Sequence, residues 1–98
     1  MVSLNPIVGS EIKKQRPCVV VSPNEANQHL NTVTVVPLTS SIRTYPTRVA
    51  IRFQNKKGEM AIDQVRSIDK SRLVGKLGQL DQKTARKLCE SLVQTFRF

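Results

Sequence analysis

Five polar residues could together act on a phosphate diester: Glu11, Arg16, Thr39, Ser40 and Asp63. We expect each at a strand end or in a loop, where functional sites usually lie. The planar guanidinium of Arg16 can bind two phosphate oxygens but holds its proton up to about pH 12, so it suits charge stabilisation. Glu11 and Asp63 could accept a proton, and a partly desolvated carboxylate would do so better at neutral pH.

RNA is the phosphate diester that such a set fits. Its own 2′-hydroxyl is the nucleophile, so cleavage needs a proton acceptor, a donor to the leaving oxygen and stabilisation of a phosphorane-like transition state. No cofactor is required. Lys and Arg number 16 against 7 Asp and Glu, and a net charge of +9 on 98 residues favours a polyanionic partner. Nucleic acid is the first candidate and an acidic peptide the second.

The sequence lacks the residues that other kinds of catalysis need. His29 is the only histidine, so one chain has no imidazole acid–base pair, and we interpret it as a surface loop residue. The carboxylates are too scattered to predict a metal cluster. The sequence has no GxSxG motif and no phosphate-binding loop with Lys-Ser/Thr. We therefore expect neither metal nor cofactor.

The cysteines and the apolar pattern predict where the protein acts. Cys18 and Cys89 lie among apolar neighbours without metal-ligand spacing, so we interpret them as reduced core residues of a cytoplasmic protein. No stretch approaches 18 apolar residues, and Met1 to Gly9 lacks the pattern of a signal peptide. We expect no contact with a membrane.

Hydrophobic patterning predicts one domain over residues 1–98, mainly β with a C-terminal helix. The run of residues 18–23 is typical of a central strand buried on both faces, and residues 24–31 are polar and rich in turn-forming residues. Further strands are expected at residues 32–38, 47–53 and 59–63, and a short strand or turn at 73–80. A polar loop is expected over residues 39–46 and a turn over 54–58.

Two of these elements carry more detailed expectations. Alternation in residues 47–53 puts Arg48 and Arg52 on an outer face. Beyond Asp81, a plausible N-cap, apolar residues recur at intervals of three and four as in an amphipathic helix: Ala85, Leu88, Cys89, Leu92, Val93 and Phe96. Short strands closed by one helix predict a small, strongly bent antiparallel sheet or partial barrel.

Several linked motifs resemble the MazF/PemK (Kid) toxin family. Gly9-Ser10-Glu11 is followed by Arg16-Pro17 and the strand Val19-Val20-Val21-Ser22-Pro23. The segments Val36-Pro37-Leu38-Thr39-Ser40 and Asp63-Gln64-Val65-Arg66-Ser67-Ile68-Asp69 come in the family's order and spacing. With the terminal helix, the resemblance covers nearly the whole chain.

The resemblance implies an SH3-like barrel of the CcdB/PemK/MazF type, assembled as a homodimer. It implies the toxin of a toxin–antitoxin pair, a sequence-specific, metal-independent endoribonuclease. Such enzymes cut single-stranded mRNA by 2′-hydroxyl attack, leaving a 2′,3′-cyclic phosphate and a 5′-hydroxyl. The cognate antitoxin would block the RNA groove with an acidic, flexible segment.

By position, Arg16 and Thr39 match the family's residues at the scissile phosphate, and Glu11 and Asp63 match acidic site residues of different members. Two departures matter. Members commonly begin with a Gly-x-Ile-Trp-x-Val strand before the segment equivalent to residues 3–6, so we expect a shortened first strand here. Some relatives carry histidine where this chain has Ser10 and arginine where it has Ala61, which leaves the general acid unassigned.

Candidate RNA-binding residues lie around these positions. A phosphate-tracking surface and a plain solubilising surface both explain the charge, and Tyr45 could stack on an unpaired base or cover a core edge. We select Lys13, Lys14, Ser40, Arg43 and Tyr45. Two alternatives stay open: a CcdB-like toxin that binds gyrase, and a non-catalytic nucleic-acid-binding module of the same fold.

Overall fold

The computed structural model describes residues 6–11 and 15–97 of the chain. Two helices are present in these residues, α1 (Asn24–His29) and α2 (Gln82–Thr95), together with short 3₁₀ turns at Ile62–Gln64 and Lys70–Arg72. The strands are β1 (Pro6–Glu11), β2 (Gln15–Val20), β3 (Thr32–Thr39), β4 (Arg48–Phe53), β5 (Lys56–Ala61), β6 (Arg66–Asp69) and β7 (Leu73–Gln79). The expected shortening of the first strand concerns residues before Pro6, which lie outside the described residues.

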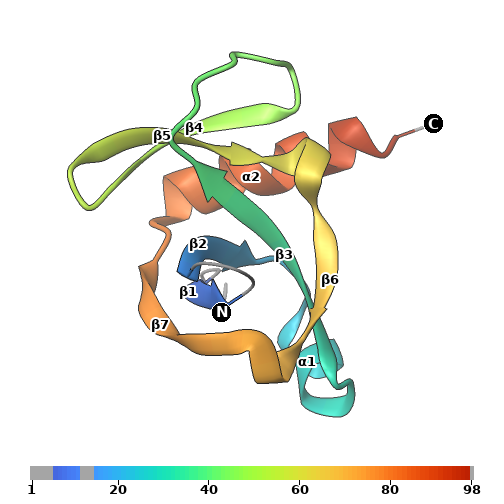
Figure 1. The fold of residues 1–98 in the computed structure, drawn as a ribbon. Coiled ribbons are helices and arrows are strands. Elements are labelled where there is room, and N and C mark those ends of the chain that lie inside the picture. The colour runs from blue at the N-terminus through green and yellow to red at the C-terminus, as the bar shows by residue number, and fades with distance from the viewer. Residues whose placement is uncertain (1–5, 12–14, 98) are drawn as a thin grey trace.

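All strand pairings are antiparallel, in the order β4-β5-β3-β2-β1-β7, with β6 paired to β3. Strand β3 is shared: its first half pairs with β6 and its last two residues pair with β5. Figure 1 shows the result, a sheet that curls into a partial barrel, with the β4–β5 hairpin extending from it and α2 across one side. The expected mainly β, bent architecture with a C-terminal helix is confirmed.

The curled sheet is buried on both faces. One cluster includes Val8, Val20 and Val35 and lies on one face of β1, β2 and β3. A second cluster includes Val19 and Val36 on the other face, together with Leu88 of α2. Because neighbouring residues of a strand point to opposite faces, the apolar run of β2 supplies both clusters. This confirms the expected strand buried on both faces.

Helix α2 begins at the predicted cap, where the Asp81 carboxylate accepts the Thr84 N–H at 2.7 Å. Ala85 and Leu88 are buried against the sheet. Leu92 also packs against the core, but the predicted stripe is wider than the part of α2 that the sheet covers. Val93 and Phe96 are more than half exposed, and Cys89 is exposed. Both cysteines are free, but only Cys18 is the expected core residue, and for Cys89 the expectation was wrong.

Three other expectations need correction. Residues 24–29, expected as turns, form the short helix α1, which buries no residue and so leaves no apolar pattern in the sequence. The β4–β5 turn is only Gln54-Asn55, both at positive φ, and the strand resumes at Lys56. The Arg48 side chain, expected on an outer face, is only 6% exposed, because the 40–47 loop folds over it.

No helix among the described residues is long and apolar enough to cross a membrane.

Candidate active site

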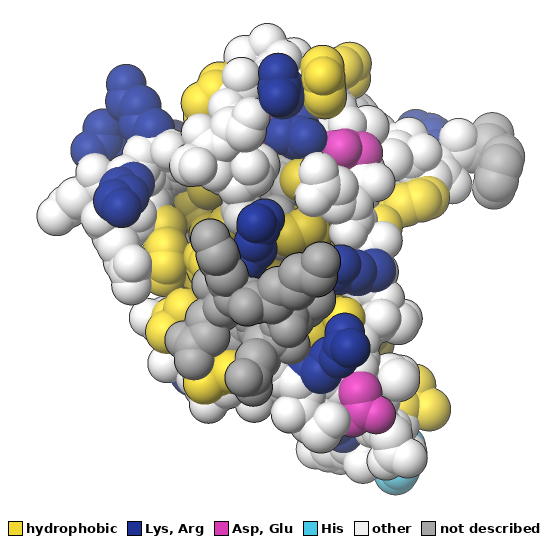
Figure 2. Space-filling view, in the orientation of Figure 1, with side chains coloured by type: hydrophobic (Ala, Val, Ile, Leu, Met, Phe, Trp, Pro, Cys, Tyr) yellow, Lys and Arg dark blue, Asp and Glu magenta, His cyan; other side chains and the backbone are white. Residues whose placement is uncertain are grey.

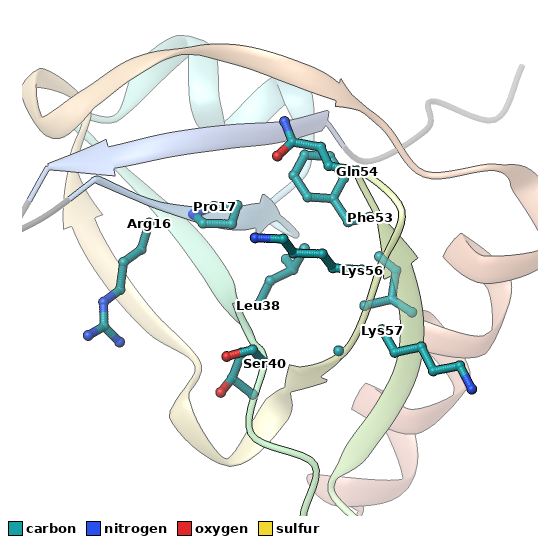
Figure 3. Close-up of a pocket in the computed structure, with 11 residues that line it drawn as sticks. Arg16, Pro17, Leu38, Ser40, Phe53, Gln54, Lys56 and Lys57 are labelled. Atoms are coloured by element: carbon teal, nitrogen blue, oxygen red, sulfur yellow. The ribbon is translucent and has the colours of Figure 1, made fainter.

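A groove of about 400 Å³ lies where the start of β2, the end of β3 and the β4–β5 hairpin meet. It is lined by Arg16, Pro17, Leu38, Thr39, Ser40, Ile51, Phe53, Gln54, Lys56, Lys57 and Gly58 (Figure 3). Two predicted site segments that are distant in sequence, Arg16 and Thr39-Ser40, are therefore brought together here.

Arg16 is placed by the pairing of β1 with β2. It is exposed near the start of β2 and faces Ser10 in the register, and Pro17 follows as the partner of Gly9. The β1 backbone continues to Glu11, which pairs with Gln15. The backbone register therefore puts positions 11 and 16 at the same end of the β1–β2 pair. The side chain of Glu11 lies outside the described residues, as do Lys13 and Lys14 entirely.

Thr39 ends β3, the strand beside β2 in the sheet, and lines the same groove. Its Oγ1 accepts the Ser41 N–H at 3.1 Å, a local turn that leaves the hydroxyl proton available to donate. Position 39 pairs with Glu59 of β5, and position 38 pairs with Met60. The backbone of Thr39 is thereby fixed by the sheet, while Ser40 begins the loop.

The β4–β5 hairpin forms the third wall and was not among the predicted site residues. Figure 3 shows the Lys56 side chain pointing into the groove toward Pro17, whereas Lys57 points away from it. Phe53 and Gln54 lie beside Lys56. The sequence analysis placed Lys56 inside a turn over residues 54–58, whereas in the structure it begins β5 directly after the two-residue turn Gln54-Asn55.

Asp63 is not among the groove-lining residues. Its carboxylate accepts two bonds from Arg48, from Nε at 2.8 Å and Nη2 at 3.3 Å, and one from the Thr47 hydroxyl at 3.1 Å. The bond from Arg48 is the main cause that lowers the pKa of Asp63 below its usual value. A carboxylate with a lowered pKa is a weaker base at neutral pH.

Glu59 is the buried acidic residue that sequence reasoning missed; it is only 4% exposed. Its carboxylate accepts the backbone N–H groups of Arg43 at 2.9 Å and Thr44 at 3.1 Å. Arg48 Nη1 lies 3.2 Å from the same carboxylate. These bonds, first the one from the Arg43 amide, lower the pKa of Glu59 and keep it ionised.

Arg43 and Tyr45, both predicted to bind RNA, lie on the exposed surface of the 40–47 loop and do not line the groove. The Tyr45 ring is about half exposed, and the Arg48 guanidinium lies 5.2 Å from its centroid. The loop thus presents an exposed aromatic ring, supported by a cation, outside the lining of the groove.

The surface around these elements is basic. Figure 2 shows Lys and Arg side chains spread among hydrophobic ones, with few acidic side chains on this face. Among the described residues, no three His, Cys, Asp or Glu side chains form a group that could hold a metal ion. What the groove offers is hydroxyl, guanidinium and ammonium donors, which suit a phosphate ester.

The chain resembles known proteins over almost its full length. Residues 1–96 match the family of PemK-like, MazF-like toxins of type II toxin-antitoxin systems. Endoribonuclease EndoA of Bacillus subtilis is 33% identical over 95 residues, which cover 91% of this chain and 82% of the relative. Endoribonuclease MazF9 of Mycobacterium tuberculosis is 35% identical over 101 residues, 93% of this chain and 86% of the relative.

A solved structure has the same fold. It is described as an endoribonuclease in complex with its cognate antitoxin, from a Mycobacterial species, and it matches with a TM-score of 0.83 at 26% identity, over 96% of this chain and 93% of that one. The curled sheet and the covering helix α2 are thus those of a toxin of the MazF type. The chain belongs to the PemK-like, MazF-like toxin family of type II toxin–antitoxin systems, and the family expected from the motifs is confirmed.

Proposed function

We propose that this chain is an endoribonuclease that cuts single-stranded mRNA at a preferred sequence, without a metal ion. The observation that carries the proposal is the groove in which Arg16, Thr39 and Ser40 converge with Lys56. Two cations and two hydroxyls around one groove can bind a phosphodiester on several oxygens. Two curated relatives are named endoribonucleases, which supports the reaction class.

In the proposed reaction the 2′-hydroxyl oxygen attacks the adjacent phosphorus, and the bond from phosphorus to the 5′-oxygen breaks. The products are a 2′,3′-cyclic phosphate and a 5′-hydroxyl. Arg16 stabilises the negative charge that develops on the phosphorane oxygens, and the Thr39 hydroxyl donates to one of them. Both residues line the groove. Among the described residues, Arg16 is not part of an ion pair, so its guanidinium can bind a phosphate.

Glu11 is our candidate for the group that accepts the 2′-hydroxyl proton. The β1–β2 register supports it, since Glu11 follows the partner of Arg16 on the neighbouring strand. Asp63 was the other candidate, but it is bound to Arg48 and Thr47 and lies outside the groove lining. We assign Asp63 to the support of Arg48, and the leaving 5′-oxygen takes its proton from water.

The proposal includes partners and location. The cognate antitoxin would cover the basic groove with an acidic, flexible segment, and a related endoribonuclease is described in complex with its antitoxin. We propose that the toxin acts as a homodimer in the cytoplasm, where mRNA is available. Lys13, Lys14, Arg43 and Tyr45 are the proposed RNA contacts beyond the groove.

The test is incubation of the purified protein with a long, mostly single-stranded RNA in excess EDTA, with the cleaved ends mapped and their chemistry determined. We expect cuts at a recurring short motif, with cyclic-phosphate and 5′-hydroxyl ends. Arg16→Ala should abolish the cuts, while Arg86→Ala, an arginine exposed on α2, should retain them. RNA that is bound but stays whole would instead indicate a binding module, and no interaction with RNA would favour a protein-directed toxin.

A further inference from the structure

The 40–47 loop connects Thr39, at the groove, to Arg48, at the start of β4, and it carries Arg43 and Tyr45. Loops of this length on a protein surface are usually mobile unless other parts of the fold bind them. This one is bound by two charged side chains from outside the loop, Glu59 of β5 and Arg48 of β4.

Glu59 binds the middle of the loop through its backbone. The two carboxylate oxygens accept the N–H groups of Arg43 and Thr44, one each. A buried carboxylate is unfavourable unless hydrogen bonds and an opposite charge compensate it. Glu59 has both, and the groups that compensate it are the loop amides and Arg48. Burial of Glu59 and the conformation of the loop therefore depend on each other.

Arg48 binds both ends of the same loop. Its Nη1 lies 3.4 Å from the Ser41 carbonyl oxygen, and its backbone N–H donates to the Tyr45 carbonyl at 3.0 Å. The guanidinium also lies over the Tyr45 ring. Asp63 binds the remaining edge of the guanidinium, which holds its plane in this orientation.

The backbone at Thr44 is evidence that this conformation is imposed. Thr44 has φ 54°, in the left-handed region that β-branched residues rarely adopt. Its N–H is bound by Glu59, and its hydroxyl donates to the Arg43 carbonyl at 2.7 Å. Strained backbone persists where the surroundings determine it, and such positions cluster at ligand-binding segments.

We propose that Glu59 and Arg48 are positioning residues that hold the 40–47 loop so that Arg43 and Tyr45 are ready to bind single-stranded RNA. The inference rests on the proposed ribonuclease function. A loop that is already ordered loses little conformational entropy on binding, whereas a released loop must be ordered by the RNA. Loss of the contacts that Glu59 and Arg48 make with the loop, which together form its anchor, therefore weakens RNA binding and raises KM. The value of kcat stays nearly unchanged, because Arg16 and Thr39 are fixed by the sheet.

The experiment measures kcat and KM on an RNA oligonucleotide with one cleavage site. We expect Glu59→Ala to raise KM about tenfold and to change kcat less than about threefold. Glu59→Gln should raise KM less, because its amide oxygen can still accept one loop N–H, and it serves if the alanine variant does not fold. Glu90→Gln, the same change at an exposed position of α2, is the control.

Two further measurements separate positioning from general stability. Hydrogen exchange should become faster at the amides of Arg43 and Thr44 in Glu59→Ala, with those of Val36 and Met60 unchanged. In a Tyr45→Ala background, Glu59→Ala should raise KM by a smaller factor, because only Arg43 of the two positioned residues is left to be released.

The outcomes are distinct. A Glu59→Ala protein whose loop amides exchange freely but whose KM is unchanged would overturn the inference, as would an equal KM increase with and without Tyr45. A wild-type protein that leaves RNA whole would overturn the proposed function and with it the role in RNA binding. Hydrogen exchange would still report whether Glu59 holds the loop, because it does not require activity.

Discussion

Gly58 lies so close to Thr39 that a Cβ atom at position 58 would be 2.6 Å from the Thr39 carbonyl oxygen. Such a contact is too short for any side chain, and the obstacle is backbone. The absence of a side chain at Gly58 therefore lets β5 approach the end of β3 where that strand borders the groove.

Replacement of Gly58 by alanine should push β3 and β5 apart at the groove. We expect Gly58→Ala to cost about 1–3 kcal/mol in the free energy of unfolding, as for other overpacked sites, and to lower kcat because Thr39 is displaced. Gly75→Ala is the matched control, since no described atom lies within 4 Å of a Cβ there. Equal effects of the two variants in urea denaturation and RNA cleavage would contradict the prediction.

Lys56 and Lys57 are neighbours in β5, but the Lys56 side chain points into the groove and the Lys57 side chain points away from it. If Lys56 contacts a phosphate of single-stranded RNA, Lys56→Ala should reduce the slope of log affinity against log salt by about 0.7. Lys57→Ala should change the slope less. Binding is measured with a 2′-O-methyl RNA, which lacks the nucleophile, and identical slopes for the two variants would argue against the contact.

Acid should destabilise the protein through the carboxylates around Arg48. The pKa of Asp63 is lowered by its bonds from Arg48, and that of Glu59 by its bonds from the Arg43 amide and other donors. A group with a lowered pKa stabilises the folded state above its unfolded pKa, about 4, and loses that contribution as pH falls through the folded value.

The free energy of unfolding should therefore decrease as the pH falls below about 4. Asp63→Asn should be less stable than wild type at neutral pH and should lose less stability in acid, since one of the responsible groups is gone. Urea denaturation between neutral pH and pH 2 measures both. The prediction is wrong if wild type and variant lose the same amount.

Helix α2 contributes to the core through one face only. Leu88 is fully buried in the cluster between sheet and helix, whereas Val93 is 64% exposed. Leu88→Ala should cost about 2–5 kcal/mol, the range for buried leucines that leave a cavity. Val93→Ala should stay within about 0.5 kcal/mol. A comparable loss in both variants by thermal or urea unfolding would show that the exposed face of α2 is covered in solution.

Elements with a local signal were predictable from the sequence. The Asp81 cap and the spacing of Ala85 and Leu88 located α2, and the apolar run of β2 predicted a strand buried on both faces. Arg16 and Thr39 were found because they belong to linked family motifs, and the fold places both at one groove. Their chemical roles stay predictions.

Features that depend on distant parts of the chain were not predictable. Glu59 and Arg48 alternate with apolar residues in their strands, which is the pattern of solvent-facing positions. Both become buried because the 40–47 loop returns over that face, and neither strand contains information about the loop's path. In the same way, the exposure of Cys89 depends on how much of α2 the sheet covers, which helical spacing does not define.

The hydrogen bonds that Glu59 and Arg48 make with the 40–47 loop all go to its main-chain groups. Glu59 and Arg48 bind the amides of Arg43 and Thr44 and the carbonyls of Ser41 and Tyr45. Every amino acid except proline supplies these groups. Exchange of loop side chains therefore keeps these hydrogen bonds, whereas replacement of Glu59 or of the Arg48 side chain removes those that they make. If the loop binds RNA as proposed, a lineage can acquire new RNA preferences by substitutions in the loop while its fold stays the same.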